Sequence, residues 1–253
     1  MTLLLSDLHL GRGSADATRA AERDAVALLR AHAPDVGPDG AVVLLGDVFD
    51  QWIEYRHTAP KLGLRLLGTL ADLADGGTRV LYTVGNRDPW HVDLLASLGV
   101  TVLTGGARLR LSGHDVYLSH GDRDLPARGA LGRLSHRLLP LLRRPAMARL
   151  YRSALPGDAG FALARAVALG FGTDGTPSPD DAAALAASAH ARLAAPGGPT
   201  IVAHGHVHEA RLDAGPDGAY LNPGYWFGDR TFARLRADGP ALCRWADGRA
   251  LPL

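Results

Sequence analysis

The sequence predicts an α/β fold, a sandwich of two mixed β-sheets flanked by helices, with a helical cap inserted into it. In the first 120 residues, short apolar runs alternate with stretches of helical periodicity, the pattern of a sheet covered by helices. Residues 199–253 alternate like strands. Residues 123–198 are rich in Ala, Leu and Arg, which indicates a helical insertion. We therefore assign 1–122 and 199–253 to the core, and 123–198 to the cap.

Each predicted element rests on its apolar spacing. Continuous apolar runs of a few residues predict buried strands, and apolar residues three or four apart predict helices. The second helix closes at Gly76-Gly77, a C-terminal stop signal. In order, the core elements are strand 3–6, helix 14–33, strand 41–45, helix 61–75, strand 79–84, a short helix near 91–98, strands near 100–103, 107–112 and 114–119, and strand 201–203. The remaining strands are predicted to form one antiparallel sheet; they are 209–212, 219–222, 230–236 and 241–245.

Composition places the chain among ordinary globular proteins. At 253 residues and 47% hydrophobic content it can bury one sizeable core and carry an insertion. A single cysteine, Cys243, excludes an intramolecular disulfide and suits a reducing cytosol. The opening residues 1–5 read as a strand rather than a signal peptide, and no apolar run reaches about 18 residues. We therefore expect a cytoplasmic protein.

Side chains that commonly bind metals follow five predicted strands. Ligands at the carboxyl ends of strands meet at one edge of a sheet. Oxygen and nitrogen donors without a thiolate suit two divalent ions, with Mn²⁺ favoured and Fe, Zn or Mg as alternatives. The other interpretation is that these residues are turn formers and core histidines. The five motifs are Asp7-Leu-His9, Gly46-Asp47, Gly85-Asn86, Ser119-His120-Gly121 and His204-Gly-His206-Val-His208.

The order of these motifs resembles that of the calcineurin-like metallophosphoesterases, from Asp7 to His208. Within them the chain is most similar to the bacterial UDP-2,3-diacylglucosamine pyrophosphatase family of lipid A synthesis. The similarity lies in Gly46-Asp-Val-Phe-Asp-Gln-Trp-Ile53, in Gly85-Asn-Arg-Asp88, and in the basic helical stretch before the final histidines. It implies a hydrolase that releases UMP and 2,3-diacylglucosamine 1-phosphate.

The resemblance also implies a role for each motif residue. Asp47 would bridge two cations with its two oxygens, and Asp47, Asn86 and Arg87 would be catalytic. Asp50, Asp88 and His204 would orient the ligands, or simply form hydrogen bonds within loops. The other ligands would be Asp7, His9 and His208 for one metal, and Asn86, His120 and His206 for the other.

Arg87 stands where many metallophosphoesterases carry a histidine that protonates an alkoxide leaving group. Arginine stays charged at neutral pH and cannot do this, but it can bind a phosphate with two hydrogen bonds. A phosphate leaving group needs no such proton, so Arg87 favours pyrophosphate cleavage. The alternative is a structural ion pair with Asp88.

The basic charge of the chain is concentrated in the predicted cap. Residues 123–171 hold nine arginines against two aspartates, although the net charge of the chain is only +1. Arg133, Arg137, Arg143 and Arg144 interleave with leucines between 131 and 142, which suits an anionic bilayer surface. A solvated helical face is the alternative. No nucleic-acid recognition module is evident, and no protein partner is inferred.

These features predict a nucleotide-linked glycolipid as substrate and peripheral association with the cytoplasmic face of the inner membrane. Two alternatives remain at this point: a phosphodiesterase or nucleotidase acting on soluble nucleotides or nucleic acid, and a catalytically silent membrane-binding protein. Three aromatic residues after the second and third motifs line the pocket or pack in the core: Trp52, Tyr55 and Trp90.

Overall fold

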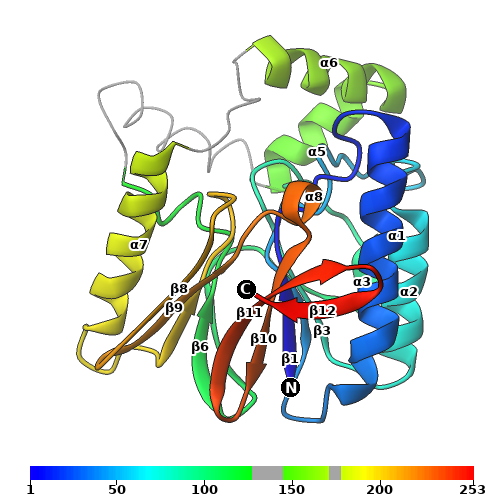
Figure 1. Ribbon diagram of the computed structural model, residues 1–253. Coiled ribbons are helices and arrows are strands. Elements are labelled where there is room, and N and C mark those ends of the chain that lie inside the picture. The colour runs from blue at the N-terminus through cyan, green and yellow to red at the C-terminus, as the bar shows by residue number, and fades with distance from the viewer. Residues whose placement is uncertain (127–144, 171–177) are drawn as a thin grey trace.

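The computed structural model describes residues 1–126, 145–170 and 178–253 (Figure 1). Two β-sheets pack face to face. Helices α1 (Ala15–His32) and α2 (Leu64–Asp75) cover the outer face of one sheet, and α7 (Pro179–Leu193) covers the outer face of the other. The short elements are η1 (Ala33–Asp35), α3 (Leu94–Ser97) and α8 (Trp226–Asp229).

The first sheet has seven strands, and both parallel and antiparallel pairs occur in it. Its order is β12-β11-β10-β1-β2-β3-β4, with β1 to β4 parallel. The strands are β1 (Thr2–Leu5), β2 (Val42–Leu44), β3 (Val80–Thr83), β4 (Thr101–Leu103), β10 (Thr231–Arg236), β11 (Gly239–Ala246) and β12 (Arg249–Pro252).

The second sheet has five strands in the order β5-β6-β7-β9-β8, and its inner strands β6, β7 and β9 are parallel. Its strands are β5 (Ala107–Leu111), β6 (His114–Leu118), β7 (Ile201–Ala203), β8 (Ala210–Gly215) and β9 (Gly218–Pro223). Two mixed sheets with helices on their outer faces confirm the predicted fold class.

Alternating side chains of the buried strands divide the core into layers. Leu3 and Leu5 of β1 point toward α1 and α2, whereas Leu4 points into the space between the sheets. The same division holds for Val42 and Val43 of β2. Because successive side chains of a strand face opposite ways, an unbroken apolar run is what a strand covered on both faces requires. The sandwich therefore holds β1 and β2 rigidly, up to the loops that follow them.

The prediction that the tail forms one antiparallel sheet is wrong. Strands β8 and β9 join the second sheet, whereas β10, β11 and β12 join the first. The chain crosses between the sheets at α8, a single turn that the apolar pattern does not indicate. Alternation shows that a strand has one buried face, but it does not identify the sheet that buries it.

Two predicted helix starts also differ from the structure. Helix α2 begins at Leu64 rather than at 61, because Gly63 before it has a left-handed backbone (φ 64°). The helix predicted near 91–98 is only the turn α3. Its first amides, those of Asp93 and Leu94, donate to the buried carboxylate of Glu54, which satisfies groups that a helix start leaves unpaired.

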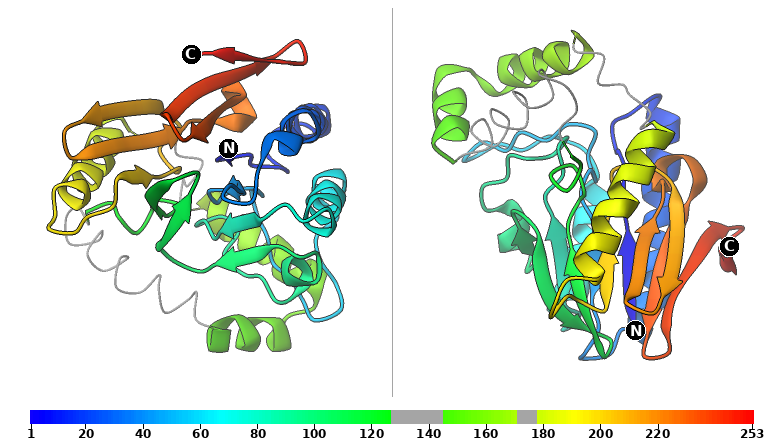
Figure 2. Two further views of the ribbon diagram at one scale, coloured as in Figure 1. Left: turned by 90° about the horizontal axis from the view of Figure 1, so that it is seen from below. Right: turned by 90° about the vertical axis from the view of Figure 1, so that its left-hand side faces the viewer.

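Helices α5 (Pro145–Ala154) and α6 (Gly157–Gly170) lie above the sheets, at the opposite end from the N-terminus (Figures 1 and 2). They fall in the predicted cap. Helix α7 also falls in that range, but Ala186 and Ala189 pack against Val202 and Tyr220 of the second sheet. The cap boundary at 123–198 therefore stays a prediction. The leucines at 131–142 and Arg133, Arg137, Arg143 and Arg144 lie outside the described residues.

Among the described residues, no helix combines the length and the apolar character needed to cross a membrane.

Candidate metal centre

The predicted ligands lie in loops at the C-terminal ends of β1, β2, β3, β6 and β7. These loops are joined to one another by backbone hydrogen bonds. His9 N donates to Asp47 O at 2.9 Å, and Gly205 N donates to His120 O at 2.9 Å. Parallel neighbouring strands thus deliver their polar side chains to one edge of the sandwich.

Five of the predicted ligands have a left-handed backbone. Among the described residues, eight non-glycine residues have positive φ, and these five are the majority of them. Such a backbone costs on the order of 1–3 kcal/mol per residue and persists only where the surrounding structure imposes it. The fold therefore holds these side chains in place at an energetic cost, as is typical of a functional site. The φ values are 55° at Asp7, 41° at His9, 49° at Asp47, 70° at His206 and 56° at His208.

The glycines of the motifs allow the loops to approach closely. A side chain at Gly85 would collide with the carboxylate and amide of Asp47. One at Gly205 would collide with the hydroxyl of Ser6 and lie against Asp7. Gly85 and Gly205, each directly before a predicted ligand, are thus glycine because another ligand loop occupies the space of a side chain there.

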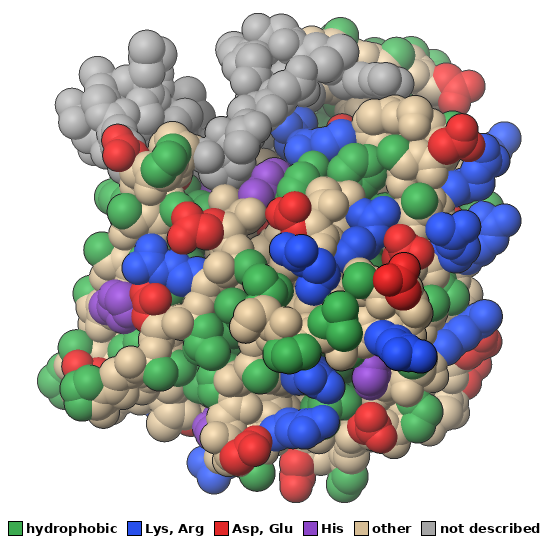
Figure 3. Space-filling model, viewed as in Figure 1, with side chains coloured by type: hydrophobic (Ala, Val, Ile, Leu, Met, Phe, Trp, Pro, Cys, Tyr) green, Lys and Arg blue, Asp and Glu red, His purple; other side chains and the backbone are tan. Residues whose placement is uncertain are grey.

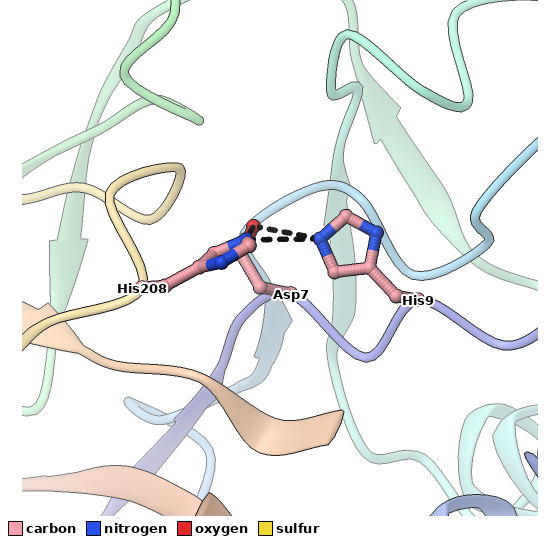
Figure 4. A group of neighbouring side chains, drawn as sticks. All are labelled: Asp7, His9 and His208. Carbon is pink, nitrogen blue, oxygen red and sulfur yellow. Dashed lines mark hydrogen bonds and ion pairs between the residues drawn. The ribbon is translucent and has the colours of Figure 1, made fainter. Parts of the chain in front are cut away.

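Asp7, His9 and His208 form the first group that could hold a metal ion (Figure 4). Nε2 of His9 lies 3.0 Å from Nε2 of His208. Oδ1 of Asp7 lies 3.5 Å from Nε2 of His9 and 3.3 Å from Nε2 of His208. Three ligand atoms from the loops after β1 and β7 therefore converge on one point.

Asp7, Asp47 and His120 form the second group. Nε2 of His120 lies 3.5 Å from Oδ2 of Asp47 and 3.1 Å from Oδ1 of Asn86. The ring of His206 lies edge-on to that of His120, with centroids 5.1 Å apart. Asp7 thus belongs to both groups, whereas the motif pattern placed it with one metal alone.

Asp47 belongs to the second group and also approaches the first. Its Oδ2 is 3.9 Å from Nε2 of His9 and 3.5 Å from Nε2 of His120. Its Oδ1 instead accepts a hydrogen bond from Arg87 N at 2.8 Å. A single oxygen, rather than the two that the sequence suggested, therefore lies between the histidines.

The donor set fits cations, because several acceptor atoms face one another. Nδ1 of His120 lies 2.7 Å from Leu45 O and donates its proton there, so Nε2 is the ring nitrogen directed at Asn86 and at the centre. Oδ1 of Asp7 is buried and has no hydrogen-bond partner among the described residues. Converging lone pairs repel unless positive charge lies among them, and this is the environment that bound divalent ions require.

The charges of the cluster support the same conclusion. Burial by itself lowers the pKa of His120, but the neighbouring carboxylates, Asp47 foremost, outweigh it and raise that pKa to about 10. Burial raises the pKa of Asp47, but His120 and His9 together hold it below its ordinary value. The cluster thus retains a proton on His120 to balance buried negative charge, a role that a metal ion would take over.

The sequence of the chain is similar to those of several curated proteins. A UDP-2,3-diacylglucosamine hydrolase of Ralstonia nicotianae is 33% identical over 230 residues, which is 85% of this chain and 79% of that protein. This chain belongs to the UDP-2,3-diacylglucosamine hydrolase family. No protein-family model matches the chain.

Other relatives align over a shorter span. The hydrolase of the same name from Porphyromonas gingivalis is 38% identical over 121 residues, 47% of this chain and 45% of that protein. The chain thus spans about half the length of several curated relatives. Among solved structures, a phosphoesterase from E. coli aligns with 98% of this chain and 95% of its own at 15% identity, with a TM-score of 0.47.

Asp50 and Asp88 occupy different places in this family member. Asp50 lies 3.3 Å from Nδ1 of His9, which leaves Nε2 of that ring directed at the centre. Asp88 is buried beneath the loops, and its carboxylate accepts the amides of Val48 and Gly85, each at 2.8 Å, and the hydroxyl of Tyr82. The geometry supports an orienting role for Asp50 toward a ligand, whereas Asp88 joins two ligand loops through their backbones.

His204 is turned away from the predicted ligands. Its Nε2 lies 3.7 Å from Oδ2 of Asp124, behind the loop that carries His120. Burial lowers the pKa of His204 to about 4, so the ring is neutral. Asp124 also pairs with Arg192 of α7 at 2.9 Å. The sequence left two roles open for His204, orienting a metal ligand or forming hydrogen bonds within a loop, and its contact with Asp124 belongs to this separate buried cluster.

The three motif aromatics have three different environments. Trp52 is fully buried and packs on Phe49, with ring centroids 4.2 Å apart, so it belongs to the core. Tyr55 lines a cavity beneath α6. Trp90 packs on Tyr151 of α5 with centroids 4.7 Å apart.

Sequence reasoning missed Arg12, Tyr225 and Asn222. Tyr225 stacks on His208, and Arg12 pairs with Asp50. Asn222 Nδ2 donates to Gly205 O at 2.9 Å and so supports the loop that carries the last histidines. The available signal was positional, since Asn222-Pro-Gly-Tyr225 follows a strand as the other motifs do.

Replacing Gly85 with alanine tests the close approach of the ligand loops. We expect Gly85→Ala to displace Asp47 and to abolish the thermal stabilisation that Mn²⁺ gives the chelator-treated wild type. Gly68→Ala is the matched control, because a side chain at Gly68 of α2 meets nothing within 4 Å. That control should gain about 0.5–1 kcal/mol of stability and keep its response to Mn²⁺. A full Mn²⁺ response in Gly85→Ala would contradict the assigned geometry.

Proposed function

We propose that this chain is a two-metal hydrolase of lipid A biosynthesis. It cleaves the pyrophosphate bond of UDP-2,3-diacylglucosamine and releases UMP and 2,3-diacylglucosamine 1-phosphate. The observation that carries the proposal is the convergence of two ligand groups on Asp7 and Asp47, in a chain whose relatives are named for this substrate.

Each metal site has its own protein ligands in this proposal. Asp7, His9 and His208 would hold one ion, Asn86, His120 and His206 would hold the other, and Asp47 would be shared between them. Oxygen and imidazole donors without a thiolate favour Mn²⁺. Two such cations, when bound, lower the pKa of water and neutralise charge on phosphate oxygens.

In this proposal Arg87 holds a phosphate of the substrate. Its amide donates to Oδ1 of Asp47, and its carbonyl accepts Trp52 N at 3.3 Å, so its backbone is fixed beside the bridging residue. The guanidinium carries two parallel donors that match phosphate oxygens. Because a phosphate leaves as a stabilised anion, Arg87 in the place of a proton-donating histidine favours a pyrophosphate substrate.

A cavity beside the metal centre offers room for the glycolipid part. It has a volume of about 580 Å³ and lies between the segment 50–62 and α6. Asp50, which contacts His9, forms part of its wall, so the cavity opens next to the reacting phosphates. We infer that acyl chains enter here, because several lining residues are apolar, among them Ile53, Leu62, Ala162 and Phe161.

The helices above this cavity suit a membrane surface. Met147 and Leu150 of α5 and Leu163 of α6 are exposed, Leu150 by 60%. Exposed apolar side chains beside a segment rich in arginine are typical of a surface that rests on an anionic bilayer. We therefore propose that the protein acts at the cytoplasmic face of the inner membrane, with the cap helices toward the lipid.

The alternative functions have less support. A protein that binds nucleic acid commonly presents a continuous basic surface. On the face of the protein shown in Figure 3, basic and acidic side chains are interspersed instead. In a catalytically silent membrane protein, the left-handed backbone at five predicted ligands would cost free energy without serving a function. The intact ligand groups therefore favour an enzyme.

Release of UMP from UDP-2,3-diacylglucosamine in mild detergent with Mn²⁺ tests the function. We expect turnover that stops with EDTA and returns with Mn²⁺. Asp47→Ala should lower the rate by at least about a hundredfold, since the bridging ligand is lost. Asp16→Ala, at an exposed ion pair of α1, is the matched control and should retain full activity. Cleavage of simple diesters without release of UMP would overturn the substrate assignment.

Replacing Arg87 with histidine tests the leaving-group argument. Loss of its charge-assisted hydrogen bonds should lower pyrophosphate cleavage by about 10- to 100-fold, whereas activity on aryl phosphodiesters should rise. Steady-state rates on both substrates measure this. If neither rate changes, Arg87 has no part in the choice of leaving group.

Flotation with liposomes tests the membrane surface. Replacing Leu150 and Leu163 with serine should weaken binding to vesicles that contain anionic lipid by about tenfold or more, because each buried leucine contributes about 1.5–3 kcal/mol. Leu251→Ser is the control, since Leu251 is 46% exposed but lies on β12, away from the cap helices. Equal loss in all variants would exclude α5 and α6 as the docking surface.

A further inference from the structure

Five side chains form a closed ring of contacts around one half of the metal centre. His9 and His208 meet at 3.0 Å, and Nδ1 of His9 lies 3.3 Å from Asp50. Arg12 Nε donates to Asp50 at 2.8 Å, and its guanidinium reaches the hydroxyl of Tyr225 at 3.5 Å. Tyr225 closes the ring by stacking on His208.

The stacking of Tyr225 restrains His208. The two ring centroids lie 4.2 Å apart and the ring planes differ by 11°. The edge of Tyr225 also faces His9, with centroids 5.9 Å apart. A parallel ring at contact distance blocks rotation of the imidazole, so Nε2 of His208 stays directed toward Asp7.

The backbone fixes Tyr225 against the first ligand loop. Tyr225 directly precedes α8 as its N-cap residue, and the next two amides, of Trp226 and Phe227, donate to the carbonyls of Ser6 and Asp7, each at 3.2 Å. Tyr225 is therefore tied to the strand end that carries Asp7, although it lies 218 residues further along the sequence. The backbone from which the ring projects is thus held in place by these bonds.

Arg12 connects the two sides of the ring. Its side chain is 23% exposed, and its partner Asp50 is 29% exposed, so the pair lies between solvent and the buried ligands. Arg12 fixes the carboxylate that fixes His9, and it also contacts the ring that fixes His208. Both histidines of one metal site are thus held through one guanidinium.

The other half of the centre is positioned by different groups. The carbonyl of Leu45 orients His120. The loop of His206 is held by a hydrogen bond that the amide of His206 donates to Oδ2 of Asp7 at 2.9 Å. Neither Arg12 nor Tyr225 takes part in these contacts. Because His9 and His208, the two ligands that the ring positions, belong to the first ligand group alone, a change in the ring should weaken that site and leave the second one unchanged.

We propose that Arg12 and Tyr225 are positioning residues for the site made by Asp7, His9 and His208, and that they set its metal affinity independently of the second site. The proposal rests on the proposed two-metal function. It predicts that the two sites can be weakened separately from outside the ligand set.

Titration of chelator-treated protein with Mn²⁺, followed by calorimetry, tests this. Wild type should bind two ions. Tyr225→Leu and Arg12→Ala should each weaken one of the two binding events by about 10- to 100-fold, the usual loss for residues that support metal ligands. The other event should keep its wild-type affinity. Tyr225→Phe keeps the stacked ring and should retain most of the affinity.

Matched controls separate positioning from general damage. Tyr151→Leu removes another half-buried tyrosine whose ring contacts a second aromatic ring, that of Trp90, and Arg108→Ala removes another ion-paired arginine, the partner of Asp115. Both should bind two ions as wild type does. Thermal melting in EDTA shows whether Tyr225→Leu folds, and Arg12→Ala and Arg12→Gln carry the test if it does not.

The proposal would be overturned if both Mn²⁺ affinities stayed unchanged in Tyr225→Leu and Arg12→Ala, or if both sites were weakened equally. An increase in KM for UDP-2,3-diacylglucosamine in Arg12→Ala, with metal binding unchanged, would instead make Arg12 a substrate contact and equally overturn it. If wild type itself binds no Mn²⁺, the two-metal function fails. If wild type binds two ions and hydrolyses substrate, only the positioning proposal is at risk.

Discussion

Mutual repulsion among buried acceptor atoms is the constraint on which the rest of the structure depends. Asp7, Asp47 and the histidines around them direct oxygen and nitrogen lone pairs at one another within a few ångströms. Such a cluster is stable only with positive charge inside it. The raised pKa of His120 shows how strongly the site attracts that charge. Divalent cations fit the same place.

The sandwich supplies the rigidity that opposes this repulsion. Strands β1 and β2 are buried on both faces, so the loops after them start from fixed points. Left-handed backbone at five ligands then turns each side chain inward, and the glycines of the motifs let neighbouring loops touch. Asp88 joins two of these loops from below, whereas Tyr225 and Arg12 support a third from the outside. Stability and function thus depend on the same few loops.

The fold class and the convergence of the ligand motifs could be predicted from the sequence, because both depend on local patterns. Apolar runs identify buried strands, and residues directly after them must meet at one sheet edge. The division of the tail between two sheets could not be predicted, since alternation in β8 to β11 does not identify the partner sheet. Tyr225 and Arg12 were missed because their contacts join segments remote in sequence and match no motif. The sequence left the role of His204 open, because this residue shares a motif with His206 and His208, and only the structure shows that its ring lies beside Asp124.

Electron paramagnetic resonance of the protein with two equivalents of Mn²⁺ tests the shared-carboxylate centre most directly. Two ions bridged by Oδ2 of Asp47 would lie about 3.5–4 Å apart, close enough for their spins to couple. We expect the multi-line spectrum of a coupled pair, and its loss in Asp47→Ala. Two independent Mn²⁺ signals, or binding of a single ion, would contradict a centre built around one bridging carboxylate.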